Sequence, residues 1–387
     1  MRIGAFAELD KAKALAPEVE ARAAEIESAR RMPADLARKL AEAGLFRIVI
    51  PRVYGGAECH PIECVRVIEE IARADGSAGW CLMIGAVTAI LAGFLPEHAA
   101  REIYGTDPCV ITGGAVAPTG KATVVAGGYR VTGRWQWGSG TQNCNWIAGG
   151  ALVIDGQSVR RLGSGAQVGL MIFSADQAEI LDTWYSSGLR GTGSHDFEVK
   201  DAFVPEERAI ALGVTPPVVD APLCRFPMFG MLALGIGAVA LGIARRAIGE
   251  LVTLATKKKP TWESQTLAQS PRVQADVAHA EAMIRSARSF LFDAIDAAWA
   301  PAAAGDTPSI ECRRDLRLAI ANAAWESARA VDLMYDAGGG SSVQATSPLQ
   351  RCFRDVHTIT QHRMVNQTMF EETGRLYLGV GDAGPFL

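Results

Sequence analysis

The apolar residues of this 387-residue chain change their spacing twice, and this change restricts the fold more than any other feature. In the first third they recur every three or four residues, the period of a helix that buries one face. Near residue 106 the spacing shortens to alternating runs rich in Val, Ile, Tyr and Trp, which are typical of strands. Beyond about residue 220 the helical period returns. The pattern predicts a helical domain over 1–105, a β-domain over 106–215 and a helical domain over 220–387.

Helix start and stop signals divide the first domain. We expect one helix over Ala16–Arg31, a second that Pro33 opens and Gly44 ends, and a third over Pro61–Ala74. The residues Asp75-Gly76-Ser77 then break the pattern. Ser77 is the expected N-cap of the next helix, because a serine hydroxyl can accept one of the free backbone N–H groups.

The middle domain is predicted to be a β-barrel or sandwich of about 100 residues. Gly127-Gly128 lies between two alternating runs and predicts a hairpin. Strands are expected at 122–126, 129–137, 146–154, 168–173 and 197–204.

The last domain is predicted to be an antiparallel bundle of four long helices. They are expected over Phe226–Thr256, from Ser270-Pro271 onward, over Ile310–Ala337 and after Arg351. The first contains Gly-Ile-Gly-Ala-Val-Ala from Gly235, which imitates a dinucleotide-binding loop. No strand precedes it and no acidic residue follows at the required distance, so its small residues indicate close helix packing instead.

Composition argues against several classes of function. Lys and Arg number 38 against 42 Asp and Glu, and the one basic run is Lys257–Lys259, so no nucleic-acid partner is expected. The eight cysteines lack paired metal-ligand spacing, so no metal site is expected, and they fit a reducing, cytoplasmic setting. The first twenty residues lack the apolar core of a signal peptide. Residues 78–95 and 226–244 are long enough to span a membrane, but their glycines favour buried core helices, and no membrane partner is expected.

The segment Gly127–Trp146 carries residues suited to cofactor chemistry. Strand alternation would place Trp135, Trp137 and Ser139 on one face. A flat aromatic ring beside a hydroxyl suits a flavin, since one can stack on the ring system while the other hydrogen-bonds a ring nitrogen. A β-domain core with two packed tryptophans would explain the same residues.

Followed by Gly188–Asp196 and Gln350–His362, that segment resembles the acyl-CoA dehydrogenase fold superfamily, specifically its flavin-dependent two-component monooxygenase branch. The resemblance runs from about Pro33 to the end. It implies a mostly α, α+β fold with an N-terminal helical domain, a middle β-domain, a C-terminal four-helix bundle and a flavin between the last two. It places Ser139 near flavin N5 as a catalytic residue. The other residues that it assigns to the flavin are Trp137, Thr141, Ile111 and Gly114, with Lys259 and Trp262 from a neighbouring subunit, where a solvated basic turn is the alternative. The glycines Gly338, Gly339 and Gly340 would let backbone amides approach a phosphate, and a helix C-cap and flexible loop would also explain them.

The region around His362 distinguishes two branches of that superfamily. Its dehydrogenases carry a Glu about eight residues after the position of Asp355, and this Glu removes the substrate α-proton. This chain has Gln361-His362-Arg363 there, and no acidic residue from 221 to 249, where the alternative base would lie. Without a carboxylate, α,β-dehydrogenation lacks its proton acceptor. His362 instead matches the monooxygenase histidine near flavin C4a, where an imidazole could donate to the peroxide or take a proton from the substrate. Arg354 and Asp355 are expected to form an ion pair that fixes this segment.

The resemblance also implies that the helix after Ser77 lines the substrate pocket. The expected wall consists of Trp80, Met83, Ile84, Val87 and Thr88. Plain core packing is the alternative explanation of these side chains. Several phenol-hydroxylating relatives carry His at the position of Thr88, so a bulky aromatic, heteroaromatic or polycyclic substrate is favoured over a simple phenolic acid.

These observations predict the oxygenase component of a two-component flavin-dependent monooxygenase. A separate NAD(P)H:flavin reductase would supply loosely bound reduced FMN or FAD, and O2 would give a C4a-hydroperoxide that hydroxylates the substrate or oxidises its N or S. The family implies a homotetramer. Two alternatives stay open: an acyl-CoA dehydrogenase or related flavin oxidase with a displaced base, and a catalytically silent flavin-binding scaffold.

Overall fold

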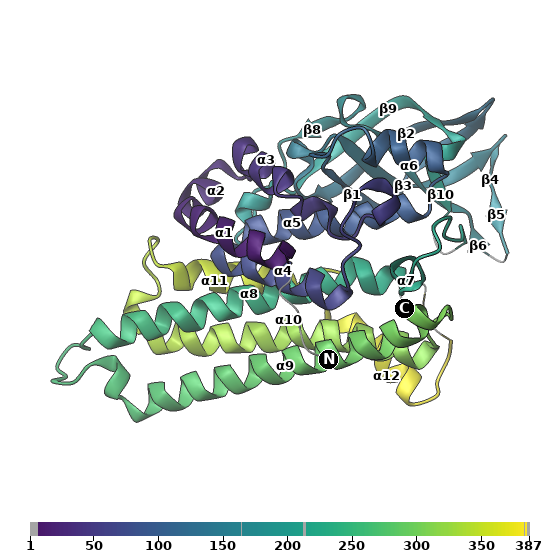
Figure 1. Cartoon of the computed structure of the whole chain (residues 1–387). Helices are drawn as coiled ribbons and strands as arrows, with labels where there is room; N and C mark the ends of the chain where they lie inside the picture. Colours follow the sequence, from purple (N-terminus) through teal and green to yellow (C-terminus); the bar gives the residue numbers. More distant parts are fainter. Residues whose placement is uncertain (1–6, 164, 212–213, 383, 385–387) are drawn as a thin grey trace.

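The computed structural model describes residues 7–163, 165–211, 214–382 and 384, and its elements follow the predicted order of helices, sheet and helices (Figure 1). The sheet lies on one side of the molecule and the long helices on the other (Figure 1). Helices α4 (Pro61–Ala74) and α5 (Gly76–Thr88) lie between them. Both pack against helix α8 (Met228–Lys257), and α5 also contacts strand β1 (Thr112–Val125). Helix α5 thus contacts both the sheet and helix α11 (Pro348–Thr360), and the candidate site lies beside it.

The N-terminal domain is built from short helices with identifiable caps. They are α1 Ala7–Ala21, α2 Ala23–Ala29, α3 Ala34–Glu42, α4 Pro61–Ala74, α5 Gly76–Thr88 and α6 Glu97–Tyr104. The single helix predicted over 16–31 is therefore wrong, because the chain breaks the helix at Arg22. The predicted N-cap Ser77 is also wrong. Asp75 caps α5, with extended backbone (φ −154°, ψ 127°) and its Oδ1 accepting from the Ala78 N–H at 2.9 Å, while Ser77 already lies in the first turn.

The β-domain is a mixed sheet. Its strands are β1 Thr112–Val125, β2 Gly128–Gly138, β3 Trp146–Asp155, β4 Ser158–Val159, β5 Arg161–Leu162, β6 Gly165–Ala166, β7 Val168–Ser174, β8 Glu179–Leu181, β9 His195–Pro205 and β10 Ala209–Ala211. The main sheet has the order β10-β7-β3-β1-β2-β9-β8, with β4 beside β3, and β5 pairs with β6 separately. Strands β1 and β3 are parallel, and the other pairs are antiparallel. The predicted hairpin is confirmed, because Val125 pairs with Gly128 and Gly127 adopts a φ of +77°.

The main sheet curls around an aromatic core. Trp135 of β2 stacks on Phe197 of β9 at a centroid distance of 5.1 Å and lies 6.0 Å from Phe173 of β7. Strands β7 and β9 are separated by β3, β1 and β2 in the sheet, so these rings meet only because the sheet bends. The Trp135 Nε1–H donates to the Gly150 carbonyl at 2.7 Å, which satisfies its buried polar atom.

The C-terminal domain is the predicted bundle with one difference. Its helices are α7 Pro222–Arg225, α8 Met228–Lys257, α9 Pro271–Ala304, α10 Ile310–Gly338, α11 Pro348–Thr360 and α12 Gln367–Tyr377. Ser270 is the N-cap residue of α9 and Pro271 opens it, as predicted. The prediction of a fourth long helix is wrong. Helix α11 ends at Thr360, and a separate helix, α12, begins at Gln367 with Asn366 as its N-cap. His362 therefore lies in a turn and not on a helix.

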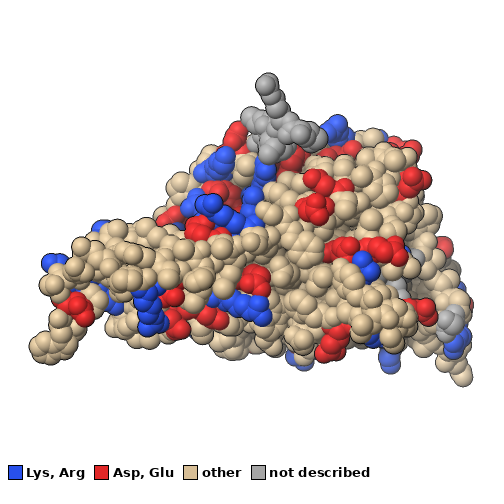
Figure 2. Space-filling view, turned by 90° about the horizontal axis from the view of Figure 1, so that it is seen from below, with Lys and Arg blue, Asp and Glu red and all other residues tan. Residues whose placement is uncertain are grey.

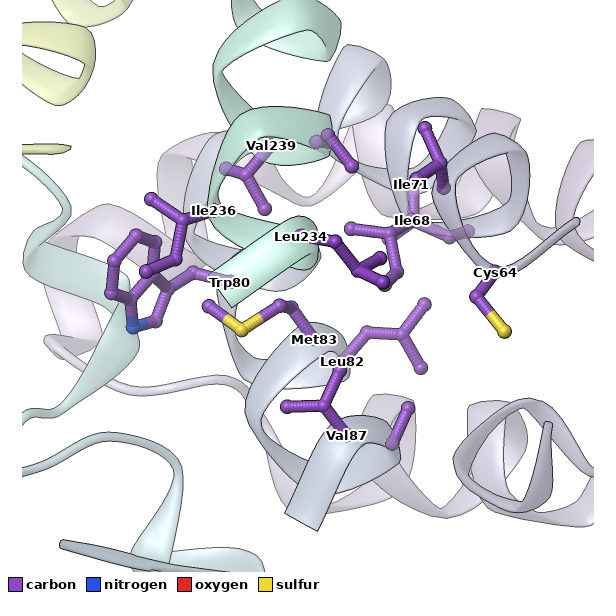
Figure 3. Close-up of a cluster of buried hydrophobic side chains, with 14 of the residues drawn as sticks. Cys64, Ile68, Ile71, Trp80, Leu82, Met83, Val87, Leu234, Ile236 and Val239 are labelled. Atoms are coloured by element: carbon purple, nitrogen blue, oxygen red, sulfur yellow. The ribbon is translucent and has the colours of Figure 1, made fainter. Parts of the chain in front are cut away.

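The glycines of α8 let neighbouring helices approach closely. A Cβ at Gly235 would lie 2.1 Å from the Met83 Cγ, and a Cβ at Gly242 would lie 2.5 Å from the Glu69 carbonyl oxygen. Figure 3 shows Met83 of α5 facing Leu234 and Ile236 of α8. The prediction of close packing in place of a dinucleotide loop is confirmed, since no strand precedes α8 directly.

Two segments have the length and hydropathy of a membrane span, Gly76–Gly93 and Met228–Lys257. Within them, 89% and 78% of the most apolar window is buried inside the protein. Packing of α5 and α8 against each other and against α4 and α10 therefore accounts for their apolar composition.

Charged side chains of both signs lie side by side on the face seen from below (Figure 2). A hollow of about 280 Å³ opens between α1, α4, α8 and α9. Two of its arginines are paired within it, Arg288 with Glu69 at 2.9 Å and Arg73 with Glu70 at 2.6 Å. The two carboxylates that line the hollow are thus both engaged by arginines.

Candidate active site

Residues from all three predicted domains meet where strand β2 ends. The Trp80 Nε1–H of α5 donates to the Ser139 Oγ at 3.0 Å. The Trp80 ring also meets His362 edge to face, with ring centroids 5.6 Å apart and an interplanar angle of 67°. The structure therefore brings together three of the residues that the sequence singled out: Trp80, Ser139 and His362.

Trp137 does not share a face with Trp135, contrary to the prediction. The pairing of β2 with β9 shifts between Trp135 and Gly138, where a β-bulge interrupts the alternation. Trp137 adopts a φ of +64°, a left-handed conformation that is uncommon for an aromatic residue. Its side chain is 68% exposed, whereas Trp135 is fully buried in the core. Because of the bulge, Trp135 packs in the core of the β-domain, whereas the Trp137 side chain points to the surface.

Two buried hydroxyls beside Ser139 were not singled out individually in the sequence. Ser194 lies 2.6 Å from Ser139, oxygen to oxygen, and Thr192 lies 2.6 Å from Ser194. The Thr192 hydroxyl donates to the Leu189 carbonyl at 2.8 Å. All three hydroxyl residues are at most 5% exposed. The segment Gly188–Asp196 had been noted for its resemblance, but only the folded chain shows that its hydroxyls connect to Ser139.

His362 lies half-buried in the turn between α11 and α12. The Met364 N–H donates to its Nδ1 at 3.3 Å, which assigns the proton of the neutral ring to Nε2. Burial, together with the charge of Arg317, lowers the pKa of His362 to about 4. The imidazole is therefore neutral near pH 7, and it is a weak proton acceptor there.

Arg317 of α10 is the residue beneath this turn that sequence reasoning missed. Its side chain is fully buried, and its Nη2 donates to the Met364 carbonyl at 3.0 Å. Burial lowers the pKa of its guanidinium to about 10, which still leaves it charged at neutral pH. Arg317 thus holds the backbone of the His362 turn and supplies the positive charge that disfavours protonation of the imidazole. Nothing in the sequence around Arg317 distinguishes it from the exposed arginines of a helix, so its burial beneath the His362 turn could not be predicted.

Arg354 and Asp355 do not form the predicted ion pair. Arg354 pairs with Glu27 of α2 at 2.5 Å. The buried Asp355 accepts the Leu189 N–H at 2.6 Å. The two side chains leave α11 in different directions, because neighbouring positions on a helix do not face each other. Both still fix the chain, since Asp355 anchors the loop that carries Thr192 and Ser194.

The predicted substrate wall divides between two faces of α5. Met83 and Val87 are buried, and Met83 packs against Gly235 of α8, so core packing explains both. Ile84 and Thr88 follow Trp80 by four and eight residues and turn toward the sheet, where the Thr88 hydroxyl lies 3.1 Å from that of Thr112. The Thr88 hydroxyl also donates to the Ile84 carbonyl at 2.7 Å, so its proton is engaged within the protein.

The remaining residues predicted near the flavin ring make backbone contacts. Thr141 is buried and donates to the Gly138 carbonyl at 2.8 Å. The Ile111 N–H donates to the Asn145 side chain at 2.9 Å. Gly114 has a φ of +145°, and a Cβ there would lie 2.0 Å from the Ala148 carbonyl oxygen, so it permits the tight pairing of β1 with β3.

The other predicted flavin residues lie at the end of the bundle that projects away from the sheet (Figure 1). Lys259 is exposed and Trp262 is 98% exposed in the loop after α8. Lys258, which was not predicted, donates to the Gly338 carbonyl at 2.7 Å and so joins this loop to Gly338 and Gly339. Within one chain these residues form a group apart from Ser139 and His362.

Comparisons with known proteins agree with this architecture. Residues 10–102 match the family model described as acyl-CoA dehydrogenase, N-terminal domain, and residues 234–367 match the C-terminal domain model of that family. The chain is 33% identical over 359 residues to an indole-3-acetate monooxygenase of Pseudomonas putida, covering 93% of this chain and 90% of that protein. It is 29% identical over 357 residues to a flavin-dependent monooxygenase, oxygenase subunit HsaA, of Mycobacterium tuberculosis, covering 90% and 89%. The structure of XiaF from Streptomyces sp. in complex with FADH2 and glycerol superposes with a TM-score of 0.90 at 25% identity, covering 98% and 97%.

The site and the comparisons point in the same direction. In the described part of the chain, the side chains that hydrogen-bond Ser139 or meet the His362 ring are the Trp80 indole and the Ser194 hydroxyl, and neither is a carboxylate. Removal of a substrate α-proton needs a base, and the low pKa of His362 makes its imidazole a weak one. The 33% identity, which extends over nearly the whole chain, is to a monooxygenase. This chain therefore belongs to the acyl-CoA dehydrogenase fold superfamily, in its branch of flavin-dependent monooxygenases, and is an oxidoreductase.

Proposed function

We propose that this chain is the oxygenase component of a two-component monooxygenase. It would use reduced FMN or FAD and O2, through a C4a-hydroperoxide, to hydroxylate an aromatic, heteroaromatic or polycyclic molecule or to oxidise its N or S. The observation that carries the proposal is that Trp80, Ser139 and His362 meet, with no hydrogen bond from a carboxylate of the described residues to any of them. Proton abstraction from a carbon acid needs such a base, whereas oxygen transfer from a flavin needs polar contacts to the ring and dry surroundings.

The residues at the end of β2 fit a flavin. Ser139 offers a hydroxyl that is 5% exposed, and Trp137 beside it offers a wide aromatic face that is 68% exposed. The positive φ of Trp137 costs of the order of 1–3 kcal/mol, and such strain is concentrated at functional sites. The reduced flavin, when bound, supplies the reactivity toward O2 that no side chain here provides.

The protein side chains would then hold and shield the reacting atoms. Ser139 would contact the N5 edge of the ring system, and the Trp80 ring would exclude water from one side of it. His362 would present its Nε2–H as a hydrogen-bond donor. Of the two roles predicted for His362, the low pKa of its imidazole favours the donor over the proton acceptor.

The proposed substrate class rests on the side chains that α5 turns toward the sheet. Trp80 and Ile84 offer apolar surface, and the Thr88 hydroxyl is already engaged by the Ile84 carbonyl. The proton of the Thr88 hydroxyl is therefore not available for donation to a substrate. A bicyclic heteroaromatic such as an indole fits this surface, and the relative that is 33% identical is named for indole-3-acetate.

The partner and the assembly are part of the same proposal. The name oxygenase subunit, carried by the relative from Mycobacterium tuberculosis, supports a separate NAD(P)H:flavin reductase. A homotetramer would explain why Lys259, Trp262, Gly338 and Gly339 lie far from Ser139 along the bundle, since a neighbouring subunit could bring them to the flavin. The cytoplasm is the proposed location.

The test is anaerobic binding of reduced FMN or FAD followed by mixing with O2 in a stopped-flow spectrometer. We expect the absorbance of a C4a-hydroperoxide that decays faster in Ser139→Ala and His362→Ala, and product from indole-3-acetate in preference to a simple phenolic acid. Reduction of a bound oxidised flavin by an acyl-CoA would favour the dehydrogenase instead. Flavin binding with no intermediate and no acyl-CoA reduction would favour a silent scaffold.

A further inference from the structure

The hydrogen-bond network of Ser139 has a fixed direction. It comprises three oxygen-to-oxygen contacts in a row: Ser139 to Ser194 at 2.6 Å, Ser194 to Thr192 at 2.6 Å and Thr192 to the Leu189 carbonyl at 2.8 Å. Oxygen atoms this close need a proton between them. The row contains three hydroxyls, and each hydroxyl has one proton to donate. Every proton in the row is therefore required for one of its contacts.

The carbonyl end determines which hydroxyl donates to which. The Leu189 carbonyl can only accept, so the Thr192 proton points to it. The Ser194 proton must then serve the contact to Thr192, and the Ser139 proton must serve the contact to Ser194. Trp80 adds a donor at the other end, since its Nε1–H points to the Ser139 Oγ. The three hydroxyl residues are at most 5% exposed, so bulk water has little access to offer alternative partners.

Ser139 consequently faces a ligand as an acceptor and not as a donor. Its proton is engaged by Ser194, and one of its two lone pairs is engaged by Trp80. One lone pair remains. The N5 atom of a flavin carries a hydrogen in the reduced form and a bare lone pair in the oxidised form. A reduced flavin can therefore donate to Ser139, whereas an oxidised flavin would place two lone pairs against each other.

We propose that Ser194 and Thr192 are specificity-determining residues that orient the Ser139 hydroxyl and so make the site select reduced over oxidised flavin. The inference rests on the proposed function, because it assumes that flavin N5 meets Ser139. It explains how an oxygenase component can take a reduced flavin from a reductase and release the oxidised one. Asp355 supports the same network from the bundle, because it holds the N–H of Leu189, whose carbonyl ends the row.

The test compares the dissociation constants of oxidised and reduced FMN and FAD, the latter measured anaerobically by fluorescence titration. Ser194→Ala and Thr192→Val each remove a hydroxyl from the row and free the Ser139 proton to point at a ligand. We expect the dissociation constant of the oxidised flavin, divided by that of the reduced flavin, to fall by about threefold to tenfold in both variants. This range corresponds to the net free energy of one hydrogen bond. Thr192→Ser keeps the hydroxyl and should keep the wild-type ratio.

Each outcome has one meaning. A ratio that is unchanged in folded Ser194→Ala and Thr192→Val, while the wild type binds reduced flavin, would overturn the orientation argument and leave the proposed function standing. A wild-type protein that binds neither flavin would overturn the proposed function and this inference with it. Thr192→Val is close to isosteric, so it keeps the test valid if Ser194→Ala does not fold.

Discussion

The indole N–H of Trp80 donates to the hydroxyl of Ser139 at 3.0 Å and joins helix α5 to the end of strand β2. The two residues are 59 positions apart in the chain. The same indole meets the His362 ring of the bundle. Trp80 is therefore the side chain at which the three parts of the molecule meet, and a substitution there tests their connection.

Trp80→Phe keeps an aromatic ring and removes the donor. We expect a loss of about 0.5–1.5 kcal/mol in the free energy of unfolding, the net worth of one buried hydrogen bond. The preference for reduced flavin should survive, because the Ser139 proton still points to Ser194. Denaturant unfolding and flavin titration measure the two effects. A loss of that preference in Trp80→Phe would show that the indole, and not Ser194, orients the hydroxyl.

His362 should titrate well below an ordinary histidine. Burial and the charge of Arg317 lower its pKa from 6.5 to about 4, so the folded chain binds this proton less readily than the unfolded chain. Its contribution to stability is present above pH 6.5 and is lost as the pH falls toward 4. NMR titration of the ligand-free protein should find the low value, and His362→Asn should unfold with a weaker pH dependence over that range. A measured pKa near 6.5 would contradict the prediction.

Asp355 should show the opposite pH dependence. Burial, reinforced by the neighbouring buried Asp75, raises its pKa from 3.8 to about 7. The folded chain binds this proton more readily than the unfolded chain, so the contribution to stability is full below about pH 4 and is lost as the pH rises through 7. Asp355→Asn keeps an acceptor for the Leu189 N–H without the charge. It should gain stability relative to the wild type between pH 5 and pH 8.

Asp355→Ala is the matched comparison for that variant. It leaves the Leu189 N–H without its partner, which costs about 1–3 kcal/mol when the group is buried. Chemical denaturation at pH 5 and pH 8 separates the two substitutions. If Asn and Ala behaved alike, the hydrogen bond to Leu189 would carry little of the effect.

Two glycines of α8 should respond to alanine with opposite signs. A Cβ at Gly242 would lie 2.5 Å from the Glu69 carbonyl oxygen of α4, whereas nothing lies within 4 Å of a Cβ at Gly249. Gly242→Ala should destabilise by about 1–3 kcal/mol through overpacking. Gly249→Ala should stabilise by up to about 1 kcal/mol through helix propensity. Thermal and denaturant unfolding of both variants test whether α4 packs on α8 as closely as described.

The exposed loop after α8 should matter for flavin and not for stability. Trp262 is 98% exposed at a φ of +72°, so Trp262→Ala should change the free energy of unfolding by no more than about 0.5 kcal/mol. Flavin affinity should nevertheless fall several-fold, because a neighbouring subunit would contribute this ring. Val252→Ala, at an exposed position of α8, is the control that should change neither quantity. Equal affinity in Trp262→Ala and the control would contradict a shared flavin site.

Much of the fold could be read from local patterns. The change of period, the hairpin at 127–128 and the start of α9 at Ser270-Pro271 depend on residues that are close in the sequence, and all three are confirmed. The predicted N-cap Ser77 failed because two suitable capping residues lie two positions apart. Backbone geometry at Asp75 selected one of them.

Part of the candidate site could be predicted from the sequence, and part could not. Periodicity and resemblance named Ser139, His362 and Trp80. The bulge at Trp137, the break that places His362 in a turn, and the links from Ser139 to Trp80 and Ser194 were decided by the tertiary structure. The sequence by itself determined the order of the helical and strand regions, because that depends on the spacing of apolar residues along the chain. The breaks at Arg22 and after Thr360 were not visible in that spacing. The direction of each site side chain depends on partners 55 and 59 positions away, and only packing brings those partners into contact.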